Sequence, residues 1–206
     1  MISDPKHHVI FLSGLGDGQL RQRELLAINY LAKRGISVTP APIDWRSQES
    51  FDGLFQRLTN LVRAQLQKHG RVILVGSSAG GSMAVNILAA LHDSNLSAIT
   101  LCSCLQVAKL PWWDSRSLDR MAHLGTATAS QLFFDSVTYC SNVGAQQLTS
   151  EDKQRLIIVQ QWADFVVPRP TMTIPGVKVF RVPGLGHGWG IAAGVHRLPE
   201  IIQSLP

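Results

Sequence analysis

The sequence predicts an α/β fold in which a mainly parallel sheet of six strands is covered by helices on both faces. Short apolar runs of four to six residues alternate along the chain with longer amphipathic segments. The runs lack the polar alternation of a strand that faces water, so they suit strands buried on both sides. The intervening segments are long enough for right-handed helical crossovers. Such crossovers connect parallel strands in a doubly wound open sheet.

Each element is predicted from its local pattern. Residues 51–68 are a clear helix, because Leu54, Leu58, Leu61 and Leu66 recur at helical spacing. We expect the strands over residues 8–12, 36–40, 72–75, 98–102, 156–160 and 177–182. We expect the helices over residues 20–34, 51–68, 79–91 and 191–204.

The alternation breaks once, between residues 107 and 150. This stretch contains two aromatic clusters, 111–113 and 132–134, and no good strand. An insertion after the carboxyl end of a strand lies over the ligand crevice in sheets of this kind. We therefore expect a single domain over residues 1–206, with 107–150 as a small, mostly helical cap or lid. An extra packing helix with loops is the alternative.

Composition restricts the class of protein. The formal net charge is +5, but the lysines and arginines are scattered, which disfavours nucleic-acid binding. No signal peptide is visible, and no apolar stretch approaches the length that spans a bilayer. The three cysteines, Cys102, Cys104 and Cys140, are expected to be buried, unpaired thiols. Such thiols match a reducing, cytoplasmic compartment.

The stretch "VGSSAGG" at 75–81 joins a predicted strand to a predicted helix. It contains neither the lysine of a phosphate-binding loop nor the spaced glycines of a dinucleotide fingerprint. Residues 76–80 instead match Gly-x-Ser-x-Gly, in which a serine occupies a strained strand-to-helix turn. In this register the central serine, and therefore the candidate nucleophile, is Ser78, and Ser77 is the variable residue before it. The alternative is a plain tight turn.

A serine hydroxyl needs a base, and the base needs a carboxylate to orient it. Of the seven histidines, His187 lies in a glycine-rich loop, "GLGHGWG", directly after the last strand. His123, in the expected cap, is the second candidate for the base. Asp164 follows the penultimate strand, whereas Asp152 precedes it and so lies at the wrong edge. Since the carboxyl ends of parallel strands share one edge, we expect Ser78, Asp164 and His187 to meet there.

Acyl transfer also needs N–H donors for a developing oxyanion. The N–H of Ala79 opens the helix after the serine, and Leu15 lies in the glycine-rich loop "SGLGDG" after the first strand. We expect these two backbone groups to form the oxyanion hole. The alternative for the loop is a flexible connector. No metal constellation is visible, and the proposed chemistry needs no cofactor.

Four segments support a resemblance to a known family: "SGLGDG" at 13–18, "GSSAG" at 76–80, "ADFVVP" at 163–168 and "GLGHGWG" at 184–190. Through these segments the sequence resembles the α/β-hydrolase superfamily over nearly the whole chain. The resemblance implies the nucleophile at Ser78, the acid at Asp164, the base at His187 and oxyanion donors at Leu15 and Ala79. There are two departures: Ser13 stands where many members have histidine, and the first predicted strand already begins at residue 8, so we do not expect the antiparallel strands that often precede it.

These observations predict a small serine hydrolase, carboxylesterase-like, that cleaves an ester or related acyl bond of a small-molecule substrate through an acyl-enzyme. A thioesterase, peptidase or lyase on the same fold is the alternative within the enzymes, and a non-catalytic binding or scaffold protein is the alternative outside them. Aromatic side chains are candidates for the substrate pocket. They are Trp112, Trp113, Phe133, Phe134 and Trp189.

Overall fold

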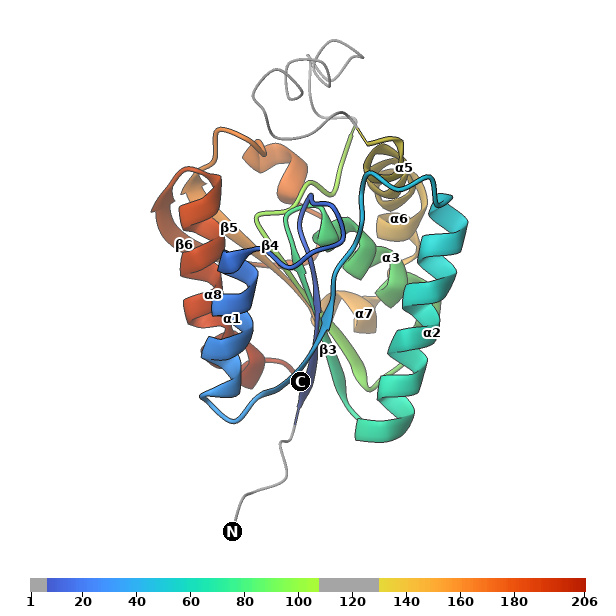
Figure 1. Cartoon of the computed structure of the whole chain (residues 1–206), viewed down its shortest axis with the longest axis horizontal. Coiled ribbons are helices and arrows are strands. Elements are labelled where there is room, and N and C mark those ends of the chain that lie inside the picture. Colours follow the sequence, from blue (N-terminus) through green and yellow to red (C-terminus); the bar gives the residue numbers. More distant parts are fainter. Residues whose placement is uncertain (1–6, 108–129) are drawn as a thin grey trace.

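A computed structural model describes residues 7–107 and 130–206. Its centre is one parallel sheet of six strands in the order β2-β1-β3-β4-β5-β6 (Figure 1). The strands are β1 (His8–Leu12), β2 (Ser37–Ala41), β3 (Val72–Ser77), β4 (Leu96–Leu101), β5 (Leu156–Ala163) and β6 (Lys178–Leu185). The predicted fold class is confirmed.

The central strands are buried on both faces, as their continuous apolar sequences predict. Every residue of β1, β3 and β4 is buried. Alternate side chains enter two separate cores, so that Ile10 and Leu74 lie in one while Phe11 and Val75 lie in the other. The sheet is therefore the shared wall of two apolar layers.

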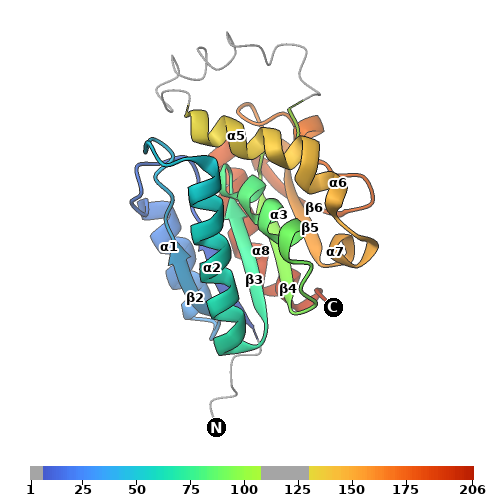
Figure 2. The same ribbon diagram turned by 90° about the vertical axis from the view of Figure 1, so that its right-hand side faces the viewer.

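Helices cover the two faces unequally (Figures 1 and 2). On one face lie α1 (Gln22–Ala32) and α8 (His187–Gln203), which contact each other and bury Leu31 and Leu198. The other face carries α2 (Phe51–His69), α3 (Gly80–Leu91) and the helices between β4 and β5. Because α3 is buried almost all round, it lies between the sheet and the outer helices.

The end of the chain differs from its prediction. The sequence placed His187 in a loop and began the helix at residue 191, whereas α8 begins at His187 itself. Glycine has low helix propensity, which hid this first turn. A Cβ on Gly190 would lie 2.0 Å from Oε1 of the buried Gln161, so the turn needs glycine for close approach to β5. Both β5 and β6 also run three residues past their predicted ends.

The insertion is described only from residue 130 onward, so residues 108–129 of the expected cap, with Trp112 and Trp113, lie outside the described residues. The described part comprises α5 (Gln131–Tyr139), a π-helical turn (Cys140–Gly144), α6 (Ala145–Gln147) and α7 (Ser150–Gln154). Both α5 and the π-helical turn contact α3. Phe133 of α5 is buried there, its ring edge-on to Trp45 at 5.9 Å between centroids.

Candidate active site

Ser78 occupies the sharp turn between β3 and α3. Its φ of +49° lies in the left-handed region, which is costly for a residue with a side chain. The turn is held by backbone hydrogen bonds: the N–H of Ser78 donates to the carbonyl of Leu101 at 2.9 Å, and the N–H of Gly81 donates to the carbonyl of Ser78 at 3.1 Å. These contacts hold the hydroxyl at the carboxyl edge of the sheet.

Two glycines make this turn possible by close approach. A Cβ on Gly76 would lie 2.5 Å from the carbonyl oxygen of Gly80, and one on Gly80 would lie 2.5 Å from the carbonyl oxygen of Leu12. Both distances are far inside van der Waals contact with backbone that cannot move aside. The glycines of "GSSAG" therefore let α3 start directly against β1 and β3.

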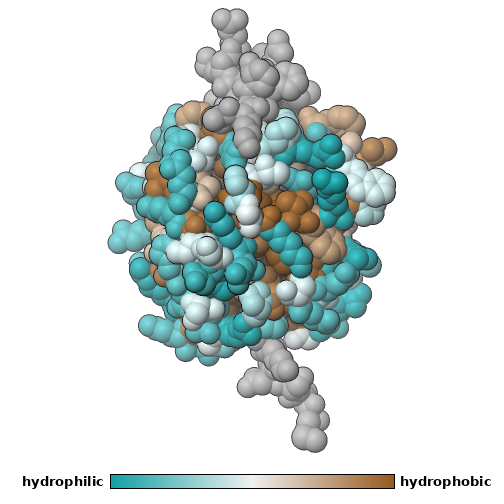
Figure 3. Space-filling model, turned by 180° about the vertical axis from the view of Figure 1, so that it is seen from behind, coloured by the Kyte–Doolittle hydropathy of each residue, from teal (hydrophilic) through white to brown (hydrophobic). Residues whose placement is uncertain are grey.

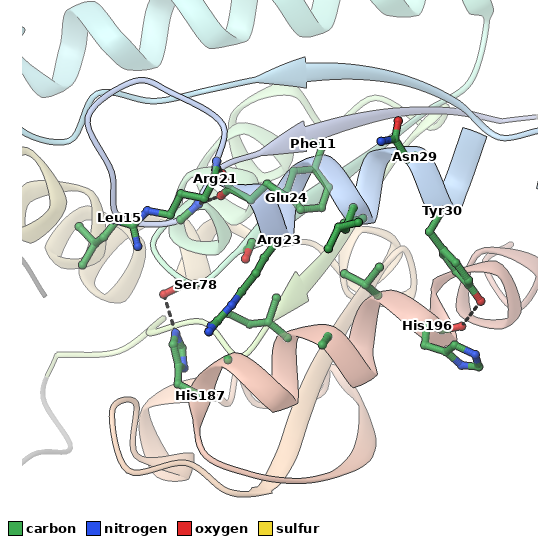
Figure 4. A pocket seen from close by; sticks show the side chains of 18 of the residues that line it. Phe11, Leu15, Arg21, Arg23, Glu24, Asn29, Tyr30, Ser78, His187 and His196 are labelled. Atoms are coloured by element: carbon green, nitrogen blue, oxygen red, sulfur yellow. Dashed lines mark hydrogen bonds between the residues drawn. The ribbon is translucent and has the colours of Figure 1, made fainter. Parts of the chain in front are cut away.

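His187, the first residue of α8, bridges the other two predicted site residues. Its Nε2 lies 2.8 Å from Oγ of Ser78, and its Nδ1 lies 2.7 Å from Oδ2 of Asp164. Figure 4 shows the imidazole directed at the serine hydroxyl. With the ring proton on Nδ1, the imidazole donates to the carboxylate and accepts from the Ser78 hydroxyl.

Asp164 follows β5, and its side chain is fully buried. Burial alone would raise the pKa of this carboxyl, but the hydrogen bond and charge of His187 and the N–H groups of Val167 and Val166 lower the pKa below its ordinary value. Both N–H groups donate to Oδ1, at 2.9 Å and 2.8 Å. The carboxylate is therefore ionised, and its other oxygen is free to orient His187.

The loop after β1 lies beside the serine. A Cβ on Gly14 would lie 3.3 Å from Cβ of Ser78. The N–H of Gly14 donates to Oε1 of Glu24 in α1 at 2.9 Å. Within the described residues, the N–H groups of Leu15 and Ala79 donate no hydrogen bond. Both are thus available for an acceptor that enters from outside.

Glu24 was not singled out in the sequence. Its Oε2 accepts the N–H of Arg21 at 2.9 Å, so the same carboxylate caps α1 and holds Gly14. An acidic residue in the first turn of a helix is the signal that could have indicated it.

A cavity of about 1100 Å³ opens beside Ser78 and His187 and continues between α1 and α8 (Figure 4). Leu15 is among its lining residues. Of the described candidates for the substrate pocket, Phe133 and Trp189 do not line this cavity, and neither does Phe134. This cavity could not be predicted from the sequence, because its walls are two helices that are far apart in the chain and meet only in the folded protein.

Apolar side chains are exposed where β5 and β6 end. Trp162 is 63% exposed, Phe165 82%, Leu185 72% and Trp189 75%. Figure 3 views the molecule from the side of the edge strand β6 and shows apolar atoms interrupting a largely polar surface. Trp189 therefore lies on the outside of α8, facing solvent, two residues after His187.

The cysteines of the described chain are free and buried, as predicted. Burial raises the pKa of Cys102 to about 12, with a further contribution from the charge of Asp164, and raises the pKa of Cys104 to about 11. Such thiols stay protonated and are poor nucleophiles. Among residues 7–107 and 130–206 there is no group of three or more histidine, cysteine or acidic side chains placed to hold a metal ion. The same residues contain no helix with the length and hydrophobicity to cross a bilayer.

Comparisons with known proteins agree with this architecture. A family model described as "Alpha/beta hydrolase family" matches residues 9–182. No curated protein matches the chain. A structural search finds a monoacylglycerol lipase of Paleococcus ferrophilus, with a TM-score of 0.59 and 14% identity over 97% of this chain and 95% of that one.

Two further structures are similar at comparable identity. One is from a study of the metagenome-derived lipolytic enzymes LipS and LipT, with a TM-score of 0.70 and 13% identity over 97% of this chain and 94% of that one. The other is the ydeN gene product of B. subtilis, with a TM-score of 0.66 and 13% identity over 96% of this chain and 97% of that one. At such identities the likeness is one of fold.

Proposed function

The chain belongs to the alpha/beta hydrolase family, and we propose that it is a serine hydrolase that cleaves a carboxylic ester through an acyl-enzyme. The observation that carries the proposal is the unbroken hydrogen-bond chain from Ser78 through His187 to Asp164. An alcohol, an imidazole and a carboxylate in this order form the constellation that activates a serine. The lipase and the lipolytic enzymes among the similar structures point to ester bonds.

In the first half-reaction, His187 accepts the hydroxyl proton of Ser78 at Nε2 while Oγ attacks the carbonyl carbon. Negative charge then develops on the former carbonyl oxygen, and the free N–H groups of Leu15 and Ala79 are the proposed donors to it. The bond to the leaving alkoxy oxygen breaks as the imidazolium returns the proton to it. Asp164 stabilises the imidazolium throughout, since its carboxylate stays ionised.

In the second half-reaction, water attacks the acyl carbon and gives its proton to Nε2 of His187. The bond between the acyl carbon and Oγ of Ser78 breaks, Oγ recovers a proton from the imidazolium, and the carboxylic acid leaves. No other reactant is needed. The buried, protonated thiols are consistent with the cytoplasmic location that we infer for the enzyme.

A fluorophosphonate probe tests the proposal directly, because it reacts with activated serines. We expect it to label the folded wild-type protein and not Ser78→Ala. The neighbouring Ser77→Ala variant is the matched control and should label normally, since the Ser77 side chain is buried and makes no hydrogen bond to His187. Folded wild-type protein that does not react would favour the scaffold alternative. Among labelled proteins, p-nitrophenyl esters and acyl-thioesters distinguish an esterase from a thioesterase.

A further inference from the structure

We propose that the cavity between α1 and α8 binds the acyl chain of the substrate, so that the preferred esters carry an acyl group of medium length. The inference rests on the proposed function, because Ser78 and His187 form one end of the cavity. An ester whose carbonyl lies at Ser78 has its acyl chain at the entrance to this space. The groove then decides which acyl groups fit.

The walls of the cavity are two facing helical stripes. On α1, the stripe consists of Arg23, Leu26, Ala27 and Tyr30. The last three follow Arg23 by three, four and seven residues, so all four lie on one face of the helix. On α8, the matching stripe consists of Gly188, Ile191, Ala192 and Val195, and Phe11 of β1 lies beneath. The two facing stripes are apolar between Arg23 and Tyr30, while Glu24 and Asn29 of α1 add polar groups to the lining.

Arg23 marks the end nearest the serine. A Cβ on Gly188 would lie 2.2 Å from its Nη1, so the guanidinium rests on the backbone next to His187. Figure 4 shows Arg23 extending from α1 towards this point, with its aliphatic stem along the cavity. The described residues include no ion-pair partner for it. Its stem continues the apolar wall while its charged head stays at the edge.

The far end is defined by a bridge between the helices. The hydroxyl of Tyr30 donates to the backbone carbonyl of His196 at 3.1 Å, and the two rings lie 5.5 Å apart between centroids (Figure 4). The guanidinium of Arg34 covers the Tyr30 ring at 4.4 Å. The lining residues on either side of Tyr30 in α1 include the polar Asn29 and Lys33. The apolar section therefore ends at Tyr30.

The length of the apolar section determines which acyl groups fit. From His187 to His196, α8 advances about 13 Å at 1.5 Å per residue. With carbon–carbon bonds of about 1.5 Å in zigzag, on the order of ten methylene groups span that distance. Leu26 is 62% exposed, so an acyl chain in the groove would remove a large apolar side chain from water. The geometry thus favours acyl groups near ten carbons over acetyl and over much longer chains.

The test compares two adjacent leucines of α1. Leu26 lines the cavity, whereas Leu25, 45% exposed, does not. We measure kcat/KM for p-nitrophenyl acetate, butyrate, octanoate, decanoate and palmitate. The wild type should be most efficient with octanoate or decanoate. A carboxylate in an apolar groove opposes the acyl chain, so Leu26→Glu should lower the decanoate-to-acetate ratio of kcat/KM by about tenfold or more, while Leu25→Glu leaves the ratio as in the wild type.

A second variant fills the groove from the other wall. Ala192→Trp, at an exposed position of α8, should lower the same ratio and move the preference towards butyrate. A wild-type profile that is flat or highest with acetate, or equal ratios for Leu26→Glu and Leu25→Glu, would overturn the inference while leaving the esterase proposal intact.

A binding measurement separates the two proposals if no ester is cleaved. Decanoate is titrated calorimetrically into Ser78→Ala, which retains the cavity. Binding of decanoate in preference to acetate, weakened by adding Leu26→Glu, supports the acyl site even where the fluorophosphonate result argues against a serine hydrolase. Absence of decanoate binding to both Ser78→Ala and the wild type would overturn the acyl site whatever the activity.

Discussion

The carboxylate of Glu24 accepts the backbone N–H of Gly14 at 2.9 Å and thereby ties the start of α1 to the loop that carries Leu15. Because the other oxygen of Glu24 accepts the N–H of Arg21, the carboxylate cannot rotate freely. The relationship makes Glu24 a positioning residue for one of the two proposed oxyanion donors. It touches neither Ser78 nor His187 through any hydrogen bond.

Glu24→Ala should therefore lower kcat for ester hydrolysis by about tenfold, because a loosened donor stabilises the transition state less well. KM should change by less than kcat, since the apolar stripes of α1 and α8 proposed to bind the acyl group are kept. The matched variant is Glu24→Gln, whose amide oxygen still accepts a backbone N–H and should restore most of the rate. If Glu24→Gln is as slow as Glu24→Ala, the hydrogen bond to Gly14 is not what matters.

Loss of the proposed nucleophile or of the proposed base should remove nearly all activity. We expect Ser78→Ala or His187→Ala to lower kcat by a factor on the order of 10⁴ or more, with Asp164→Asn also severe. Because the groups act together, the double variant Ser78→Ala/His187→Ala should be no slower than Ser78→Ala alone. Steady-state kinetics with p-nitrophenyl esters measures these effects. A His187→Ala variant with the wild-type rate would show that another group is the base.

The turn at Ser78 should not tolerate a methyl group on either flanking glycine. Gly76→Ala and Gly80→Ala each place a Cβ 2.5 Å from backbone oxygen, so we expect a loss of about 3 kcal/mol or more in the free energy of unfolding. Gly16→Ala is the control, because its nearest neighbours would lie 3.7 Å or further from the added Cβ. Urea denaturation monitored by tryptophan fluorescence measures the difference. Near-native stability of Gly76→Ala would mean that β3 and α3 separate at low cost.

The pH dependence of stability should report on His8. Its ring is hydrogen-bonded to Ser37 at 3.0 Å and Thr39 at 2.9 Å and stacks on His69 at 3.9 Å between centroids. Burial, together with the charges of His69 and Lys68, lowers the pKa of His8 from 6.5 to about 4. As the pH falls from 6.5 towards 4, the unfolded chain binds a proton that the folded chain resists, so this contribution to stability is lost.

Urea unfolding of the wild type and of His8→Gln at pH 7.5 and pH 5 tests whether His8 causes the loss of stability in acid. The free energy of unfolding should fall more steeply with acid in the wild type, because glutamine cannot take up the proton. The wild type should also be the more stable of the two at pH 7.5. Equal losses in both proteins would mean that His8 titrates alike in the folded and unfolded states.

The sequence predicted the sheet well because each strand has a local signature. Runs such as Val72–Val75 are apolar throughout, and only burial on both faces explains such a run in a short strand. The three polar residues of the candidate site were placed at one edge by the same logic, since each follows a different parallel strand. The structure brings Ser78, His187 and Asp164 within hydrogen-bonding distance.

Features that depend on tertiary contact were not visible. The first turn of α8 reads as a loop because Gly188 and Gly190 are poor helix formers, and only their contacts with Arg23 and Gln161 explain them. The described aromatic residues that the sequence suggested for the substrate pocket do not line the cavity. Phe133 packs in the core against Trp45, while the cavity is lined by α1, which contributes none of the predicted site residues.

Helix α8 begins with the imidazole at His187 and, within three turns, supplies Ile191, Ala192 and Val195 to one side of the groove. The proposed proton acceptor and the proposed acyl-binding surface therefore belong to the same helix. An acyl group that does not fit the groove and tilts α8 would displace Nε2 of His187 from Oγ of Ser78. Selection between acyl groups would consequently act on kcat as well as on binding, and it would need no separate lid or loop.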